Sequence, residues 1–98
     1  MIRVRGGSPI SRKDLAIALD EAKIGNRMLF GGNLVRQPVF SALRRESTPL
    51  RIRVVGDLPG ADATMSESLF VGTYPGLDAP RLGYIAGVIA ACLRQNRP

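Results

Sequence analysis

The sequence predicts an α/β (α+β) fold, a small mixed sheet with helices packed on one face. Two segments, one near each end of the chain, carry apolar residues at the i, i+3, i+4 spacing of an amphipathic helix. Short runs of residues that are apolar, or that alternate between apolar and polar, are separated from the two helices and from one another by turn residues, and such runs are typical of strands. The length of 98 residues suits one domain, so residues 1–98 are expected to form a single layer of helices on a sheet.

The first predicted elements are a strand at residues 2–5 and a helix at residues 11–23. Ser11 is a helix-capping residue, and Asp14 stands three positions later, where a capping box places an acid. Gly25 follows at the position of a C-terminal glycine cap. The apolar face of this helix consists of Leu15, Ala18, Leu19 and Ala22.

The middle of the chain predicts shorter elements. These are a strand at 28–30, one helical turn at 39–43, a loop at 44–49, an extended segment at 51–55, a short helix at 61–66 and a buried strand at 69–71.

The last predicted element is a helix capped by Asp78, with Pro80 in its first turn. Its apolar stripe is expected to consist of Leu82, Ile85, Ala86, Ile89 and Leu93. Cys92, the one cysteine, falls in this helix and is expected to be a buried structural thiol, so no intrachain disulfide can form.

Composition narrows the possible functions. The chain has no histidine, which removes Ser–His catalysis and the commonest metal ligand, and no cysteine cluster exists to bind a metal. The net charge of +6 comes mostly from scattered arginines, which favours a solvated face over an anion site. The start of the sequence shows no signal peptide and no window reaches the ~18 apolar residues of a membrane span, so we expect a cytoplasmic protein without membrane contact.

Residues 25–38 have the composition of a polar ligand pocket. Arg27 and Arg36 offer forked donors for phosphate oxygens, and Asn33 and Gln37 can both donate and accept hydrogen bonds. The glycines of the segment permit close approach of a backbone to a ligand. A tight turn with exposed arginines explains the same composition equally well, and both interpretations stay open.

Residues 70–77 end a strand in a turn fixed by proline and glycine. Tyr74 is the residue of this segment that can offer a ring or a hydroxyl to a site.

These two segments carry a resemblance to a known family. Residues 27–38 resemble the RLLFAGNL-x-RQP stretch of the CDP-4-keto-6-deoxy-glucose 3-dehydrase branch of the DegT/DnrJ/EryC1/StrS family, and residues 70–77 are similar to its FWVG-x-YPGL. The similarity runs from about Ile2 to the final helix. The sequence departs from the pattern at Leu69, since the Phe-Trp pair is not kept, and at Gly31, which replaces another small residue.

The resemblance implies the small C-terminal domain of a fold-type I aminotransferase-like enzyme. Such enzymes bind pyridoxal or pyridoxamine phosphate in a large domain, act on nucleotide-linked keto sugars for deoxysugars of surface polysaccharides such as lipopolysaccharide, and usually work as dimers. The large domain has no counterpart in this sequence, so no cofactor and no catalytic residue are expected in this chain. The substrate-side residues carried over from the motifs are Arg27, Asn33, Arg36, Gln37 and Tyr74, with Arg36 expected to meet the nucleotide diphosphate.

Three functional hypotheses remain. The chain is a truncated or split-enzyme small domain that acts with a large-domain partner chain or as a homo-oligomer, a non-catalytic nucleotide-sugar-binding or regulatory module, or a small basic nucleic-acid-binding protein. The regulatory hypothesis requires Arg27, Asn33 and Arg36 to converge on one concave spot, and the nucleic-acid hypothesis has weak support from charge alone. A detached small domain is also expected to expose an apolar patch, for which the candidates are Phe30, Leu34, Val39 and Phe40.

Overall fold

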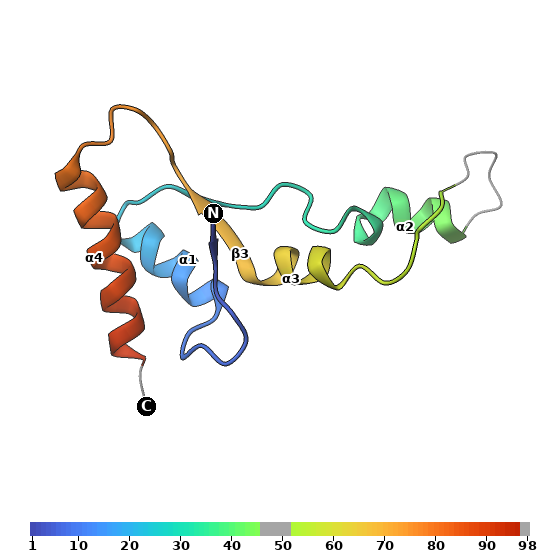
Figure 1. Ribbon diagram of the computed structural model, residues 1–98, viewed down its shortest axis with the longest axis horizontal. Coiled ribbons are helices and arrows are strands. Elements are labelled where there is room, and N and C mark those ends of the chain that lie inside the picture. The colour runs from blue at the N-terminus through green and yellow to red at the C-terminus, as the bar shows by residue number, and fades with distance from the viewer. Residues whose placement is uncertain (46–51, 97–98) are drawn as a thin grey trace.

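The structure, a computed structural model, describes residues 1–45 and 52–96. Its elements in chain order are β1 (Ile2–Arg3), α1 (Arg12–Glu21), β2 (Asn26–Met28), the 3-10 helix η1 (Leu34–Arg36), α2 (Pro38–Arg45), α3 (Pro59–Glu67), β3 (Ser68–Val71) and α4 (Ala79–Gln95). Figure 1 shows two parts: a core of α1, α4 and the sheet, and an arm that extends from it and carries α2 near its far end. We call residues 29–45 the outgoing limb of the arm and residues 52–67 its returning limb.

The sheet has three strands in the order β1-β3-β2, so the last strand in sequence lies at its centre. Both pairings are antiparallel, with Leu69 of β3 opposite Ile2 on one side and Met28 on the other. The predicted α/β (α+β) class is confirmed, while the sheet itself is antiparallel at both pairings rather than mixed. Antiparallel neighbours follow from the route of the chain, because the arm leaves from β2 and returns directly into β3.

The hydrophobic core lies between α1, α4 and β3. Leu19 and Leu69 are fully buried, and the buried apolar residues as a group are Ile10, Leu15, Ala16, Leu19, Ile24, Leu69 and Cys92. The predicted capping box of α1 is confirmed: the Asp14 backbone N–H donates to Ser11 Oγ at 3.2 Å, and the Ser11 backbone N–H donates to Asp14 Oδ2 at 2.8 Å. The start of α1 is therefore fixed by local contacts.

The final helix begins as predicted but buries a different stripe. The Arg81 backbone N–H donates to the capping Asp78 Oδ1 at 3.1 Å. Ile85 and Ile89 pack against the core as expected, and Cys92 is buried, with desolvation raising the pKa of its thiol. The residues of the expected stripe that turn out exposed are Leu82, Ala86 and Leu93.

Other differences lie at the ends of elements. The turn after α1 uses Lys23, whose φ of 61° is left-handed, in place of the predicted glycine cap at Gly25, because the Ile24 backbone N–H already donates to the Leu19 carbonyl. The second strand ends at Met28, which leaves Phe30 in a turn with a φ of 38°. Residues 44 and 45 belong to α2, residues 52–55 form no strand, and positions 46–51 of the predicted loop and extended segment lie outside the described residues.

The described residues of the arm form no hydrophobic core of their own. None of the described residues of η1, α2 and α3 is buried, and the one buried side chain on the outgoing limb is Asn33. The Cα radius of gyration is 17.4 Å, whereas a compact domain of this length has about 13 Å. The molecule is therefore a small packed core with a projecting arm (Figure 1).

The same substitution is expected to destabilise the protein far more at the sheet centre than on the exposed side of α4. Leu69→Ala removes a side chain that is 0% exposed and should lower the free energy of unfolding by about 2–5 kcal/mol. Leu82→Ala truncates a side chain that is 53% exposed and should change it by less than about 1 kcal/mol. Urea denaturation of both variants measures the difference, and equal losses would contradict the assigned core.

Candidate functional site

Two of the polar residues predicted at residues 25–38, Asn33 and Arg36, meet one carboxylate, Asp62 of α3. Arg36 donates to Asp62 through Nε to Oδ1 and through Nη2 to Oδ2 at 2.8 Å, which is a bidentate ion pair. Asn33 donates from Nδ2 to Asp62 Oδ1 at 2.9 Å and is only 2% exposed. We call these three residues the Asp62 cluster.

The Asp62 cluster joins the two limbs of the arm. Asn33 caps η1 on the outgoing limb, accepting a hydrogen bond from the Val35 N–H with Oδ1 while its Nδ2 faces α3 on the returning limb. Since neither limb contributes a buried apolar side chain, this cluster is the main specific contact described between them.

Electrostatics of the cluster favour the charged forms. Hydrogen bonds from Arg36 and then Asn33 lower the pKa of Asp62 from its usual 3.8 to about 2, and the same carboxylate raises the pKa of Arg36. Both side chains remain partly exposed, so the ion pair is open to solvent screening.

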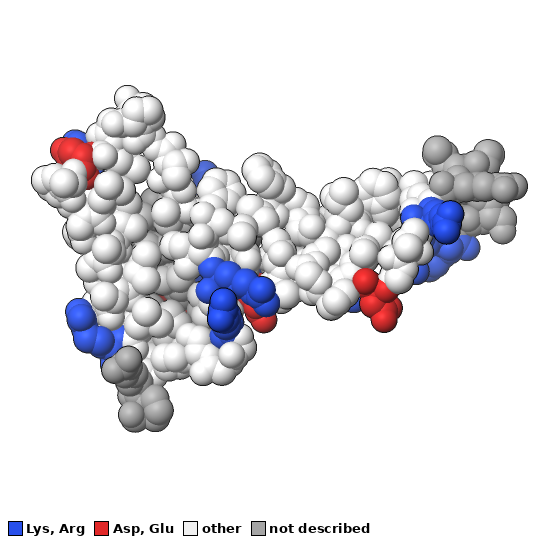
Figure 2. Space-filling model, in the orientation of Figure 1, with Lys and Arg blue, Asp and Glu red and all other residues white. Residues whose placement is uncertain are grey.

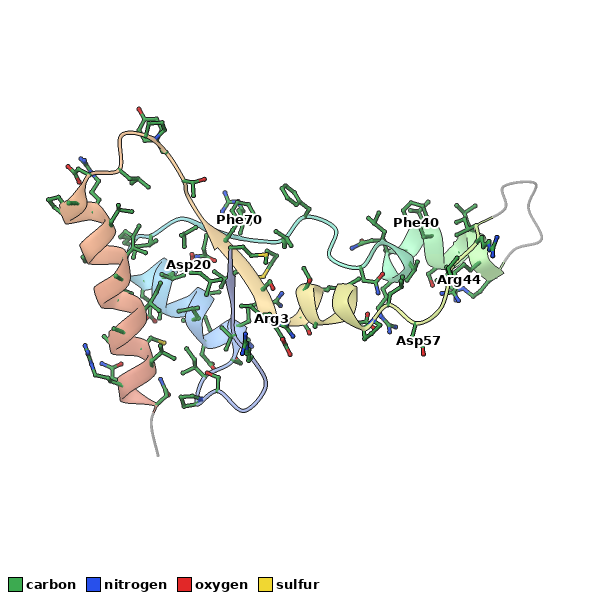
Figure 3. The ribbon with its side chains drawn as sticks, in the orientation of Figure 1. Arg3, Asp20, Phe40, Arg44, Asp57 and Phe70 are labelled. Carbon is green, nitrogen blue, oxygen red and sulfur yellow. The ribbon has the colours of Figure 1, made fainter. Side chains whose placement is uncertain are left out.

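A cavity of about 660 Å³ opens beside the cluster. Asn33, Arg36 and Asp62 form part of its wall, together with Arg44 from α2 and Asp57 from the returning limb. Figure 3 shows Arg44 and Asp57 at the far end of the arm. Two arginines face two aspartates here, so the cavity is polar but carries no excess of positive charge.

Gln37 and the neighbouring glycines shape the turn that leads into the cluster. Gln37 donates from Nε2 to the Gly31 carbonyl at 2.6 Å. Gly32 has a φ of 62°, and a Cβ there would lie 2.5 Å from Met65 Cγ, so a side chain at this position would push the limbs apart. Arg12 of α1 donates to the Met65 carbonyl at 2.6 Å, which fastens the returning limb to the core.

The remaining predicted site residues lie elsewhere. Arg27 on β2 is exposed and donates to the Asn26 carbonyl, and Tyr74 is 71% exposed on the turn after β3. Neither lines the cavity beside the Asp62 cluster. The structure thus brings Asn33 and Arg36 together, places Gln37 at the adjoining turn, and does not bring Arg27 or Tyr74 to the same spot.

Two prominent residues of this region were not predicted as site residues. Asp62 had no visible role, because its partners lie 26 and 29 positions away in the sequence. Phe30 is 90% exposed with a left-handed φ, and its ring centroid lies 5.8 Å from that of Phe70. The glycine pair Gly31-Gly32, which follows Phe30, was the sequence feature that could have indicated a turn at this position. Of the candidates for an exposed apolar patch, Phe30, Leu34 and Val39 are each exposed, while Phe40 is only partly exposed.

An apolar groove of about 480 Å³ runs between the turn after α1 and the start of α4. Lys23 lies on it, but its lining includes no carboxylate, and the other cation there, Arg81, is paired with Asp78 at 2.9 Å. A pyridoxal phosphate site needs an anion cradle and a polar partner for the ring nitrogen beside its lysine, so these residues do not fit that cofactor. Among the described residues no group of His, Cys, Asp and Glu side chains is placed to hold a metal ion.

The positive charge is dispersed on the face that Figure 2 shows. Lys and Arg side chains lie there in separate small groups over the core and the arm, not in one continuous patch. Within residues 1–45 and 52–96, no helix has the length and apolar content needed to cross a membrane.

Protonation of Asp62 should break the contact between the two limbs of the arm only when the pH falls well below about 4. A carboxylate whose pKa is lowered by folding stabilises the folded form above its usual pKa, and that contribution is lost as the pH falls from about 4 toward 2. We expect Asp62 to titrate near pH 2 in carbon-detected NMR and the arm contacts to persist at pH 3. Titration near pH 3.8 would contradict the cluster.

Asp57 provides the matched control for this prediction. It lines the same cavity but accepts none of the hydrogen bonds described for Arg36 and Asn33. Asp57→Asn should leave the Arg36 Nε–H resonance unchanged, and Asp62→Asn should shift it.

Comparison with known proteins places this geometry in context. The chain is 42% identical over 84 residues to the lipopolysaccharide biosynthesis protein RfbH of Salmonella typhimurium, a match that covers 86% of this chain and 18% of that protein. It is 30% identical over 89 residues to the dTDP-4-dehydro-2,6-dideoxy-D-glucose 3-dehydratase of Saccharopolyspora spinosa, covering 91% of this chain and 18% of that protein. No protein-family model matches the chain.

The chain thus spans about a fifth of the length of these relatives. The resemblance predicted from residues 27–38 and 70–77 is confirmed: the chain is a homologue of one segment of deoxysugar and lipopolysaccharide biosynthesis proteins that include a nucleotide-sugar 3-dehydratase.

Proposed function

We propose that the chain serves as the small, non-catalytic part of a nucleotide-sugar dehydratase or aminotransferase of the DegT/DnrJ/EryC1/StrS family, in cytoplasmic biosynthesis of deoxysugars for surface polysaccharides. It completes the substrate site of a large cofactor-binding part, supplied by a partner chain or by the remainder of a longer protein. The observation that carries the proposal is the match to a lipopolysaccharide biosynthesis protein and to a dTDP-sugar 3-dehydratase, over nearly all of this chain and 18% of each relative.

Arg36 remains the best candidate for the nucleotide diphosphate. Its Nε and Nη2 donate to Asp62, which leaves Nη1 free of described contacts for a phosphate oxygen. Asp62 and Asn33 would act as positioning residues that hold this guanidinium in a fixed direction, at the cost of part of its attraction for an anion. Arg27 and Tyr74, both exposed, would meet the sugar nucleotide only when another surface faces them.

The cofactor belongs to the other part of the enzyme under this proposal. Pyridoxal or pyridoxamine phosphate would supply the electron sink for dehydration or amination, and the chain's own residues would orient the substrate and exclude water. The apolar lining of the groove beside Lys23, which does not suit the cofactor, supports placing the cofactor in the other part of the enzyme.

A segment exchange in the Salmonella protein tests the proposal. We expect a chimera that carries this chain in place of the matching 84-residue segment to restore the lipopolysaccharide profile of cells lacking that protein, because the substitute supplies the same substrate-side surface. This chain expressed alone should not restore it. The profile is measured by gel electrophoresis of extracted lipopolysaccharide.

The control is the same chimera with Arg36→Lys, which keeps the charge but loses the fork, and should lower activity with a larger rise in KM than fall in kcat. A soluble chimera of normal size that restores nothing would reject the proposal. Restoration by the isolated chain would also reject it, since the chain would then be catalytic alone.

A further inference from the structure

Arg12 connects the hydrophobic core to the base of the arm. It is the first residue of α1, directly after the capping residue Ser11, and its Nη1 donates to the Met65 carbonyl at 2.6 Å across 53 positions of sequence. Met65 lies in the last turn of α3, where the returning limb enters β3 (Figure 1). Because the capping box fixes the start of α1, the Arg12 side chain reaches α3 from a well-ordered support.

The contact satisfies the C-terminal end of α3. The last four carbonyls of a helix lack donors within the helix, and the residues of α3 include no Lys or Arg that could interact with them. Arg12 supplies both a donor and a positive charge at this end, which the helix dipole favours. In the same turn the Val4 backbone N–H donates to the Glu67 carbonyl at 2.9 Å. Residues of the core therefore hold the end of α3.

Met65 also touches the outgoing limb. A Cβ on Gly32 would lie 2.5 Å from Met65 Cγ and 3.2 Å from Met65 Cα, so the two limbs are in contact at this point. Arg36 follows in η1, and Gln37 folds back onto the Gly31 carbonyl at 2.6 Å. A displacement of Met65 would therefore move the turn at the base of the outgoing limb, and Arg36 with it.

Stability alone does not account for an arginine at position 12. Its Nε is buried and has no hydrogen-bond partner among the described residues, and an unpaired buried N–H costs free energy. Arg12 is also not one of the residues that make up the hydrophobic core. A methionine would bury a similar stem without the orphaned donor, but it could not donate to the Met65 carbonyl. What the guanidinium adds is a directional contact with the arm.

From these contacts we infer that Arg12 is a positioning residue, which sets the direction of the arm relative to the core and thereby the place of the Arg36 guanidinium. The direction of the arm is a property of this chain. The effect on Arg36 as a substrate ligand rests on the proposed function.

Residual dipolar couplings of backbone amides in the 98-residue chain test the direction of the arm. The matched control for Arg12→Met is Lys13→Met, which removes the same charge from the neighbouring, exposed position. We expect Arg12→Met to reduce the couplings of α2 and α3 by about twofold or more relative to those of α1 and β3, because the arm then samples several directions. Lys13→Met should leave them unchanged, and Arg12→Lys, which keeps a donor, should restore most of the loss.

A urea titration of the same variants separates positioning from folding. Arg12→Met should unfold at nearly the same urea concentration as the unmodified chain, because loss of the hydrogen bond is offset by removal of the orphaned Nε. Unchanged couplings of the arm in folded Arg12→Met would overturn the inference. An unfolded Arg12→Met would overturn it as well, since Arg12 would then be needed by the fold as a whole.

A double-variant cycle tests the route through Arg36. The enzyme is the Saccharopolyspora dehydratase with its matching 89-residue segment replaced by this chain, and the substrate is dTDP-4-dehydro-2,6-dideoxy-D-glucose. We expect Arg12→Met to raise KM by about threefold or more with a smaller change in kcat, and to add less than about twofold when Arg36→Lys is already present.

Independent effects of the two substitutions, which multiply in the double variant, would overturn the role assigned to Arg12. An inactive parent chimera would instead reject the proposed function. The dipolar couplings would then still decide whether Arg12 directs the arm.

Discussion

The arm depends on one carboxylate. Asp62 accepts hydrogen bonds from Arg36 and Asn33, and through them the outgoing limb is tied to the returning limb. The described residues of these limbs include no buried apolar side chain. A second polar contact, from Arg12 to the Met65 carbonyl, ties that returning limb to α1. Hydrophobic burial therefore organises only the core, and directional polar contacts set the shape of the rest.

The contrast between a hydrophobic core and an arm held by polar contacts explains why so much of the protein surface is exposed to solvent. The core includes one face of the small sheet, α1 and one side of α4, while the arm and the other side of α4, with Leu82 and Leu93, are exposed to solvent. This exposed surface lies on a chain that matches 18% of the length of each relative.

Sequence signals predicted the structure correctly where the contacts that form it join residues close together in the chain. Ser11 with Asp14, and Asp78 before Pro80, predicted the starts of α1 and α4 because capping contacts span three residues. The central strand at Leu69 was recognised from its apolar run.

Features set by distant contacts were not predictable in the same way. The partnership of Asp62 with Arg36 crosses 26 residues and a reversal of the chain, so no periodicity records it. The sequence pattern placed Leu82 and Leu93 in the core because α4 is apolar on both sides, and only the position of α1 and the sheet decides which side is covered. Of the predicted site residues, Asn33 and Arg36 lie together beside Asp62, whereas Arg27 and Tyr74 do not line the same cavity.

The central claim is that a hydrophobic core supports an arm held by polar contacts. Native-state hydrogen exchange of the 98-residue chain tests it most directly. We predict that amides of α1 and β3 exchange only through global unfolding, while amides of α2 and α3 exchange much faster through local opening of the Asp62 cluster. Equal protection of the arm and the core would contradict this account.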